Sequence, residues 1–242
     1  MTHLVTSGCS FSDYENPERT WPLHLQDLTQ DKYDKFHHLG ACGQGEDYIS
    51  RSVIYRVQQL LKENESDNIF VMVCWSGLQR RAILVNNETT KMHYRFKDWE
   101  MGESETMRGV SIGSWQDFDE EYLKFLTEEQ NIIISLEHMI RTQDFLRANN
   151  IDYKFFGFCN LFANLDEENF LTRGRGARID KKYPNTSYLF DIMDWNKWWF
   201  HNEFGGLADW VNDNITDGFD GKGKNTGHPF SNSQKLFTEN VV

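Results

Sequence analysis

Short apolar runs typical of β-strands alternate with longer segments of helical spacing along most of this 242-residue chain. We expect strands over residues 3–8, 35–39, 68–74 and 151–159. We expect helices over residues 47–62 and 120–149, where apolar side chains recur with the period of a helix. Strands that are joined by helices pair in parallel within one sheet. The alternation therefore predicts one α/β domain whose mainly parallel sheet has helices on both faces.

Two segments interrupt this alternation within a domain that we expect to span residues 1–242. Residues 86–116 are polar and mixed, with a hairpin-like stretch at residues 92–96, and we interpret them as an insertion or lid after the third strand. Residues 160–220 form a long loop-rich segment whose tryptophans argue against disorder. Long irregular segments in compact domains usually carry function, so both segments are candidate functional loops.

The first predicted strand runs into Gly8-Cys9-Ser10, and no helix fits before it. Open α/β sheets bind ligands beyond the carboxyl ends of their strands, where the Ser10 hydroxyl is expected. Ser12 is the alternative nucleophile, although its position favours capping the segment that follows. His228 stands near the other end of the chain, in a Gly-His-Pro triplet before a short helix-like tail. An early serine and a late histidine together predict a nucleophile and its base.

These two motifs resemble the first and last blocks of the SGNH (GDSL-type) hydrolase family. The family's Gly-Asp-Ser-x-Ser block corresponds to residues 8–12, which puts Ser10 at the position of the nucleophile. Its Asp-x-x-His-Pro block corresponds to residues 225–229, which puts His228 at the position of the base. The Gly-Cys-Ser-Phe and Gly-His-Pro sequences are also similar to those of such proteins encoded by tailed phages.

The resemblance implies a three-layer α/β/α sandwich with a mainly parallel, flavodoxin-like sheet of about five strands. It implies a serine esterase without a cofactor, with a carbohydrate O-deacetylase as the favoured type. It also implies an oxyanion hole built from backbone N–H groups near Ser10 and at Gly43, which corresponds to the glycine of the family's second block.

The sequence departs from the family pattern at two positions. The asparagine of the third block is missing, and Gln79 is our candidate for the donor that replaces it in the oxyanion hole. The aspartate three residues before the histidine is replaced by Asn225, which still has the polar oxygen needed to orient the imidazole of His228. Asp217 and Asp220 are alternatives for that orienting role.

Three side chains are candidates for contacting the substrate. Trp75 and Arg80 belong to the segment that follows the third strand, and Trp198 belongs to a tryptophan-rich cluster. Indole rings stack on sugar rings, and guanidinium groups bind carboxylates or sulfates. The alternatives are that the arginine is simply solvated and that the tryptophans pack at the edge of the core or bind a partner.

Charge and cysteine spacing exclude several classes of partner. The chain has 37 acidic and 25 basic residues, and its net charge of −12 is poorly suited to nucleic acid or an anionic membrane. The N-terminus lacks a signal peptide and no apolar run is long enough to span a bilayer, so we expect a cytoplasmic location. The four cysteines lack the paired spacing of a zinc site, so we expect free thiols and no metal; they are Cys9, Cys42, Cys74 and Cys159.

The sequence therefore favours an esterase that acts on a small-molecule or carbohydrate ester, with Ser10 as nucleophile and His228 as base. One alternative is an inactive scaffold that serves as a binding protein or a structural protein of a virion, with a virion or a second copy of the chain as its partner. Another is a transferase that passes the acyl group to a sugar instead of to water.

Overall fold

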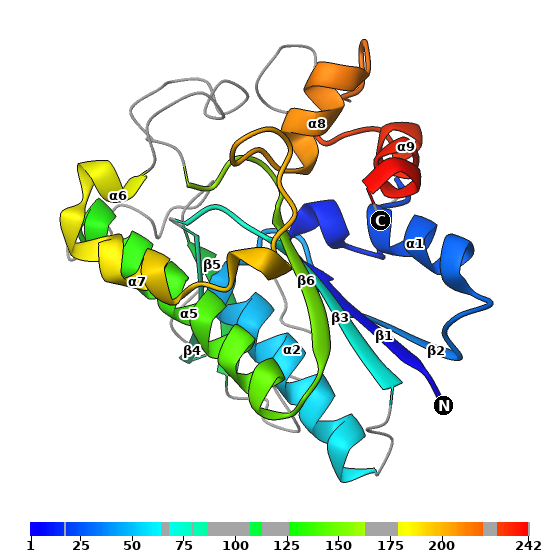
Figure 1. Cartoon of the computed structure of the whole chain (residues 1–242), viewed down its shortest axis with the longest axis horizontal. Coiled ribbons are helices and arrows are strands. Elements are labelled where there is room, and N and C mark those ends of the chain that lie inside the picture. Colours follow the sequence, from blue (N-terminus) through cyan, green and yellow to red (C-terminus); the bar gives the residue numbers. More distant parts are fainter. Residues whose placement is uncertain are drawn as a thin grey trace.

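The computed structural model describes residues 1–16, 18–63, 68–78, 80–86, 107–112, 126–162, 179–219 and 227–241. Its main sheet consists of β1 (His3–Gly8), β2 (Lys35–His38), β3 (Ile69–Trp75) and β6 (Asp152–Gly157). These strands are all parallel and lie in the order β2-β1-β3-β6 (Figure 1). The predicted α/β class and parallel pairing are confirmed. The fifth strand implied by the family resemblance is not found in this sheet among the described residues.

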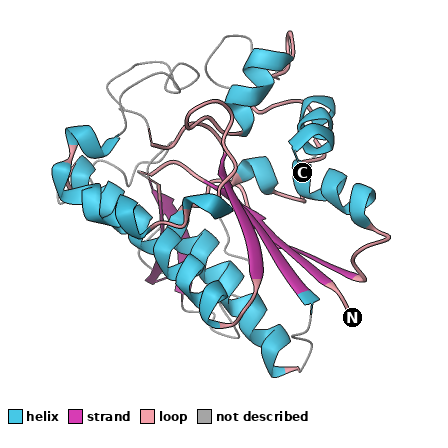
Figure 2. Ribbon diagram, in the orientation of Figure 1, coloured by secondary structure: helices cyan, strands magenta, loops and turns pink. Residues whose placement is uncertain are grey.

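Helices cover both faces of the sheet (Figure 2). On one face, α2 (Glu46–Lys62) contacts β1, where the hydroxyls of Ser52 and Ser7 lie 2.7 Å apart, and α5 (Glu128–Ala148) packs beside α2. On the other face lie α1 (Trp21–Thr29) and α9 (Ser231–Val241). There the rings of Trp21 and Phe237 lie 5.1 and 5.6 Å from the ring of Phe156 on β6. The arrangement is compatible with a three-layer sandwich.

β1 is the innermost part of the molecule. All six of its residues are buried, because it has a strand on each side and helices over both faces. A strand in that position needs apolar or small side chains in both directions, which accounts for the run from Leu4 to Gly8.

The long predicted helix before the fourth strand is present as α5, which the structure describes from residue 128. Thr127 caps its first turn, since the threonine hydroxyl accepts a hydrogen bond from the backbone N–H of Gln130 at 3.1 Å. Asn149 and Asn150 end it, and Asn150 adopts a left-handed φ of 56° that lets the chain turn into β6.

The segment after β3 forms a second, smaller sheet. β4 (Arg81–Asn86) and β5 (Met107–Ile112) pair in an antiparallel ribbon that is separate from the main sheet. The hairpin-like stretch predicted at residues 92–96 lies outside the described residues, as does most of the predicted insertion at 86–116.

The segment predicted to be loop-rich, residues 160–220, contains three short α-helices in its described part. These are α6 (Ile179–Lys182), α7 (Ser187–Ile192) and α8 (Leu207–Asn214). The segment also contributes to an aromatic cluster in which the ring of Phe162 contacts those of Phe190 on α7, Trp195, Trp198 and Phe200. Helices this short depend on tertiary packing more than on local propensity, which is why sequence periodicity does not reveal them. Within the described ranges, no helix has both the length and the apolar character needed to cross a bilayer.

Candidate active site

Ser10 and His228 meet at the carboxyl edge of the main sheet. Ser10 opens a short 3-10 turn (Ser10–Ser12) directly after β1, and His228 lies in the segment that leads into α9. The Oγ atom of Ser10 lies 2.7 Å from Nε2 of His228, although 218 residues separate them in the chain. The contact predicted from the two motifs is therefore confirmed, and it has the geometry of a hydroxyl beside a base.

The sheet topology accounts for the position of Ser10. The chain leaves β1 toward β2 on one side, while β3 lies on the other side of β1. Ligands of open α/β sheets bind outside the carboxyl ends of the strands at such a reversal of order. Gly8 permits the sharp turn there, because a Cβ atom at this position would lie 2.2 Å from the Ser12 hydroxyl and 2.7 Å from the carbonyl oxygen of Cys74.

Ser12 is not placed to act as the nucleophile. Its side chain is fully buried and accepts a hydrogen bond from the indole N–H of Trp21 at 2.8 Å. The predicted role of Ser12 as a cap of the following segment is wrong, because its hydroxyl accepts from a side chain and not from a backbone N–H. The donor is the indole of Trp21, the first residue of α1. Of the two serines in the turn, Ser10 alone contacts the imidazole of His228.

An aromatic ring and a backbone bridge hold His228 in place. The imidazole lies against the ring of Phe11, with a centroid distance of 5.0 Å. The following Pro229 is bridged to Phe219, and the N–H of Phe230 donates to the carbonyl of Gly218 at 2.9 Å. The segment around residues 217–219 therefore fixes the loop that carries the histidine.

Of the three residues predicted to orient His228, the structure describes only Asp217. Asn225 and Asp220 lie outside the described residues. Asp217 is described, is exposed and has a left-handed φ of 53° in a turn. No hydrogen bond joins Asp217 to His228 in the described part of the chain, so its alternative role is not supported.

The second loop of the site runs from β2 to α2 and contains Gly43. This glycine has a left-handed φ of 73° and lies outside the helices and strands, as a turn that presents a backbone N–H requires. The carboxylate of Asp13 accepts the backbone N–H of Cys42 at 2.8 Å, and Asp13 forms a bridge with Gly40. Asp13 thus ties the serine loop to the glycine loop. Its role was not visible in the sequence, because its partners follow a different strand.

The substrate-contacting candidates divide into one rim residue and two core residues. Trp75 is fully buried, and its ring packs edge-on against Phe155 at 5.3 Å. Trp198 is 5 % exposed and belongs to the aromatic cluster around Phe162. Both are packed in the core, so the prediction of direct substrate contact is wrong for them. Arg80 is half-buried and lies near the site, and Gln79 is outside the described residues.

The four cysteines are free thiols. Three of them are buried and Cys42 is exposed, and each follows or ends a strand at this edge of the sheet. Full burial raises the pKa of Cys74, and partial desolvation together with the nearby carboxylate of Asp13 raises the pKa of Cys42. Both effects keep these sulfurs protonated and weaken them as nucleophiles beside Ser10. In the part of the chain that the structure describes, no three His, Cys, Asp or Glu side chains form a metal-binding group.

A hydroxyl within hydrogen-bond distance of an imidazole nitrogen, with a nearby turn that offers backbone donors, has the parts needed for acyl transfer. A comparison of the chain with protein-family models and with curated proteins finds no match.

Proposed function

We propose that this protein is a serine esterase of the SGNH (GDSL-type) hydrolase type, with Ser10 as nucleophile and His228 as base. The observation that carries the proposal is the 2.7 Å contact between Ser10 Oγ and His228 Nε2. Two side chains from opposite ends of the chain form the pair expected of a nucleophile and its activating base.

The fold supports the same proposal. The order β2-β1-β3-β6 agrees with the first four strands of a flavodoxin-like sheet, with β6 in the fourth position. The candidate nucleophile follows the central strand, and the glycine turn follows its neighbour β2. Both loops therefore open at the edge where doubly wound sheets bind ligands.

The chemistry follows from these positions. His228 takes the proton of Ser10 while the serine oxygen forms a bond to the acyl carbon of the ester. His228 then gives this proton to the alcohol oxygen as the ester bond breaks, which leaves the acyl group on Ser10. A water molecule attacks the acyl carbon, His228 accepts the proton of the water, and Ser10 regains a proton as the acid leaves.

The developing negative charge needs donors in a fixed position. The backbone N–H groups of Ser10 and Gly43 are our candidates, with Gln79 as the side-chain donor in place of the family's asparagine. Asn225 is the proposed partner that orients His228. The favoured substrates are acetyl esters of carbohydrates, and the reaction requires no cofactor.

A fluorophosphonate probe tests the proposal, because it labels only an activated serine. We expect the wild-type protein to be labelled and to hydrolyse p-nitrophenyl acetate. Ser10→Ala should abolish labelling, and His228→Ala should slow both labelling and hydrolysis by about 100-fold or more. The double variant should lose little more than Ser10→Ala, because the base has nothing to activate once the nucleophile is gone.

Matched controls use a serine and a histidine outside this contact. Ser187→Ala on α7 and His201→Ala, whose ring bonds Asp213 at 3.0 Å, should leave labelling unchanged. A folded wild-type protein that is not labelled, and is no faster than Ser10→Ala on a panel of acetylated sugars, would contradict the esterase. That result would favour the binding or virion scaffold.

A further inference from the structure

Arg80 is a half-buried cation held beside the site by three local contacts. Its backbone N–H donates to the carbonyl of Gly77 at 2.8 Å, which folds the chain back after β3. Its Nη1 atom donates to the hydroxyl of Ser76 at 3.3 Å. Its guanidinium group lies 5.7 Å from the centre of the Phe158 ring. The side chain is therefore anchored rather than loose on the surface.

Aromatic contacts connect this cation to the proposed base. The ring of Phe158 lies 5.1 Å from that of Phe11, which in turn lies 5.0 Å from the imidazole of His228. The glycine loop lies on the other side, since a Cβ atom on Gly45 would be 2.6 Å from the carbonyl of Arg80. Arg80 thus flanks the site between the loop that follows β2 and the aromatic rings under His228.

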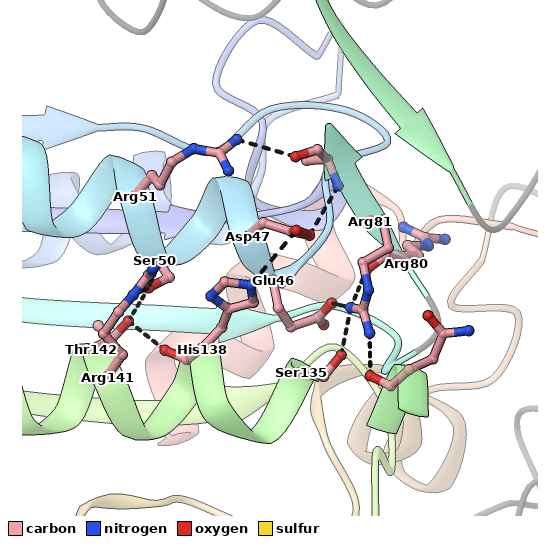
Figure 3. A network of polar contacts seen from close by, with 12 residues as sticks. Glu46, Asp47, Ser50, Arg51, Arg80, Arg81, Ser135, His138, Arg141 and Thr142 are labelled. Atoms are coloured by element: carbon pink, nitrogen blue, oxygen red, sulfur yellow. Dashed lines mark hydrogen bonds and ion pairs between the residues drawn. The ribbon is translucent and has the colours of Figure 1, made fainter. Parts of the chain in front are cut away.

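The neighbouring Arg81 shows what a structural arginine looks like here. It is 1 % exposed, and its guanidinium donates to the Ser135 hydroxyl at 2.8 Å and to the carbonyl of Asn131. It also lies 4.0 Å from the carboxyl group of Glu46. Figure 3 shows Arg81 pointing into the space between α2 and α5, whereas Arg80 turns away from that space.

The charge of Arg80, in contrast, is not paired within the described protein. Among the described residues, no carboxylate lies within ion-pair distance of its guanidinium. The charge of Arg80 acts to lower the pKa of Glu46, but burial has the larger effect and raises that pKa to about 8, so Glu46 is not a charged partner for Arg80 at neutral pH. An anchored arginine without an anionic partner among the described residues is unexpected in a chain of net charge −12.

We propose that Arg80 binds an anionic oxygen group of the substrate, such as a carboxylate, and thereby makes the esterase prefer negatively charged esters. The proposal rests on the esterase function proposed above. A guanidinium presents several N–H donors in a planar fork that matches a carboxylate, and only one of its nitrogens is engaged by Ser76.

The test compares para-acetoxybenzoate with its uncharged methyl ester. Wild-type protein should show a higher kcat/KM for the charged ester, and Arg80→Gln should lower the charged-to-neutral ratio by about 10- to 100-fold. Arg80→Lys should keep part of the preference, because it keeps the charge but not the fork. Arg147→Gln, an exposed change in the last turn of α5, should leave the ratio unchanged.

Two kinetic results would overturn the role of Arg80. One is a wild-type ratio near one, and the other is an equal loss on both esters in Arg80→Gln, which would make Arg80 a donor to the reacting oxygen instead. A binding measurement distinguishes failure of the Arg80 proposal from failure of the esterase proposal, because the Ser10→Ala variant should still bind the charged ester. Calorimetry should give about 10-fold weaker binding or worse for the Ser10→Ala, Arg80→Gln double variant, even if no hydrolysis is ever seen. Equal binding by the two variants would overturn the proposal.

Discussion

At the scale of single residues, the carboxylate of Asp13 connects the serine turn to the turn that contains Gly43. Asp13 accepts the N–H of Cys42 and lies one residue beyond the serine turn. A charge-assisted hydrogen bond of this kind fixes the peptide that enters Cys42, one residue before Gly43 with its left-handed φ of 73°. The position of the Gly43 N–H is thus coupled to the serine loop through one side chain.

Asp13→Ala should therefore lower kcat for p-nitrophenyl acetate by about 10-fold, because a misplaced oxyanion donor costs activity in the transition state. The free energy of unfolding should fall by about 1–3 kcal/mol, because Cys42 loses its acceptor. Asp13→Asn keeps an oxygen acceptor and should lose less of both. The measurements are steady-state kinetics and urea titration.

Asp191→Ala, an exposed change on α7, is the control for the loss of one negative charge. If Asp13→Ala retained the wild-type kcat while its stability fell, the glycine turn would have no part in the reaction.

At the scale of elements, polar side chains join α2, β4 and α5 behind the site (Figure 3). Asp47 in the first turn of α2 accepts the backbone N–H of Ala82 on β4 at 3.0 Å. The same carboxylate lies 3.6 Å from His138 of α5. Burial lowers the pKa of His138 to about 4, so this contact is not an ion pair at neutral pH.

Glu46 is the member of this network that links stability to pH. Both of its carboxyl oxygens are buried with no hydrogen-bond partner among the described residues, and burial raises its pKa to about 8. The Arg81 guanidinium at 4.0 Å lowers the pKa, but burial is the larger effect. The pKa of Glu46 in the folded protein is raised above its unfolded value of about 4.5. Protonated Glu46 therefore makes its full contribution to the free energy of unfolding below pH 4.5. This contribution is lost as the pH rises toward 8.

Glu46→Gln keeps the shape of the neutral side chain and removes the titration. Relative to wild type, this variant should gain stability steadily from pH 5 to pH 8, by on the order of a few kcal/mol in total. Urea titrations across this range measure the effect, with the exposed Glu203→Gln as control. A difference between Glu46→Gln and wild type that is the same at every pH would show that the pKa of Glu46 is not raised in the folded protein.

Local patterns predicted some elements of this protein better than others. Central strands such as β1 and β3 were predictable, because burial on both faces demands a continuous apolar run. The nine-residue helix α1 and the short helices α6, α7 and α8 were not predicted, because helices this short depend on contacts with distant residues, as between Phe162 and Phe190 of α7.

Residues of the site were likewise predictable where a local motif marks them and not where only distant contacts place them. Ser10 and His228 stand in short local motifs and were predictable from them. Asp13 was not, because its partner Cys42 is 29 residues away. Trp198 was assigned to the substrate because its residue type suits a sugar, and only its 5 % exposure shows that it belongs to the core.

At the scale of the whole molecule, the site exists because the two ends of the chain pack together. The turn after the first strand carries Ser10, and the loop before the last helix carries His228. Gln234 of α9 connects these ends from inside, where it is 1 % exposed. Its side-chain oxygen accepts the backbone N–H of Trp21 at 3.0 Å, and its side-chain nitrogen donates to the carbonyl of Pro229 at 3.1 Å.

Gln234→Met should break both connections at similar volume. The N–H of Trp21 and the carbonyl of Pro229 would be left buried without partners, so the free energy of unfolding should fall by roughly 2–4 kcal/mol. Because His228 is the neighbour of Pro229, a shift of Pro229 would displace the imidazole from Ser10. The rate of fluorophosphonate labelling should therefore fall by about 10- to 100-fold even where the variant is fully folded. Asn240→Ala on the exposed side of the same helix should change neither quantity by much. Labelling at the wild-type rate in folded Gln234→Met would mean that α9 only stabilises the protein, and that His228 is positioned by its own loop.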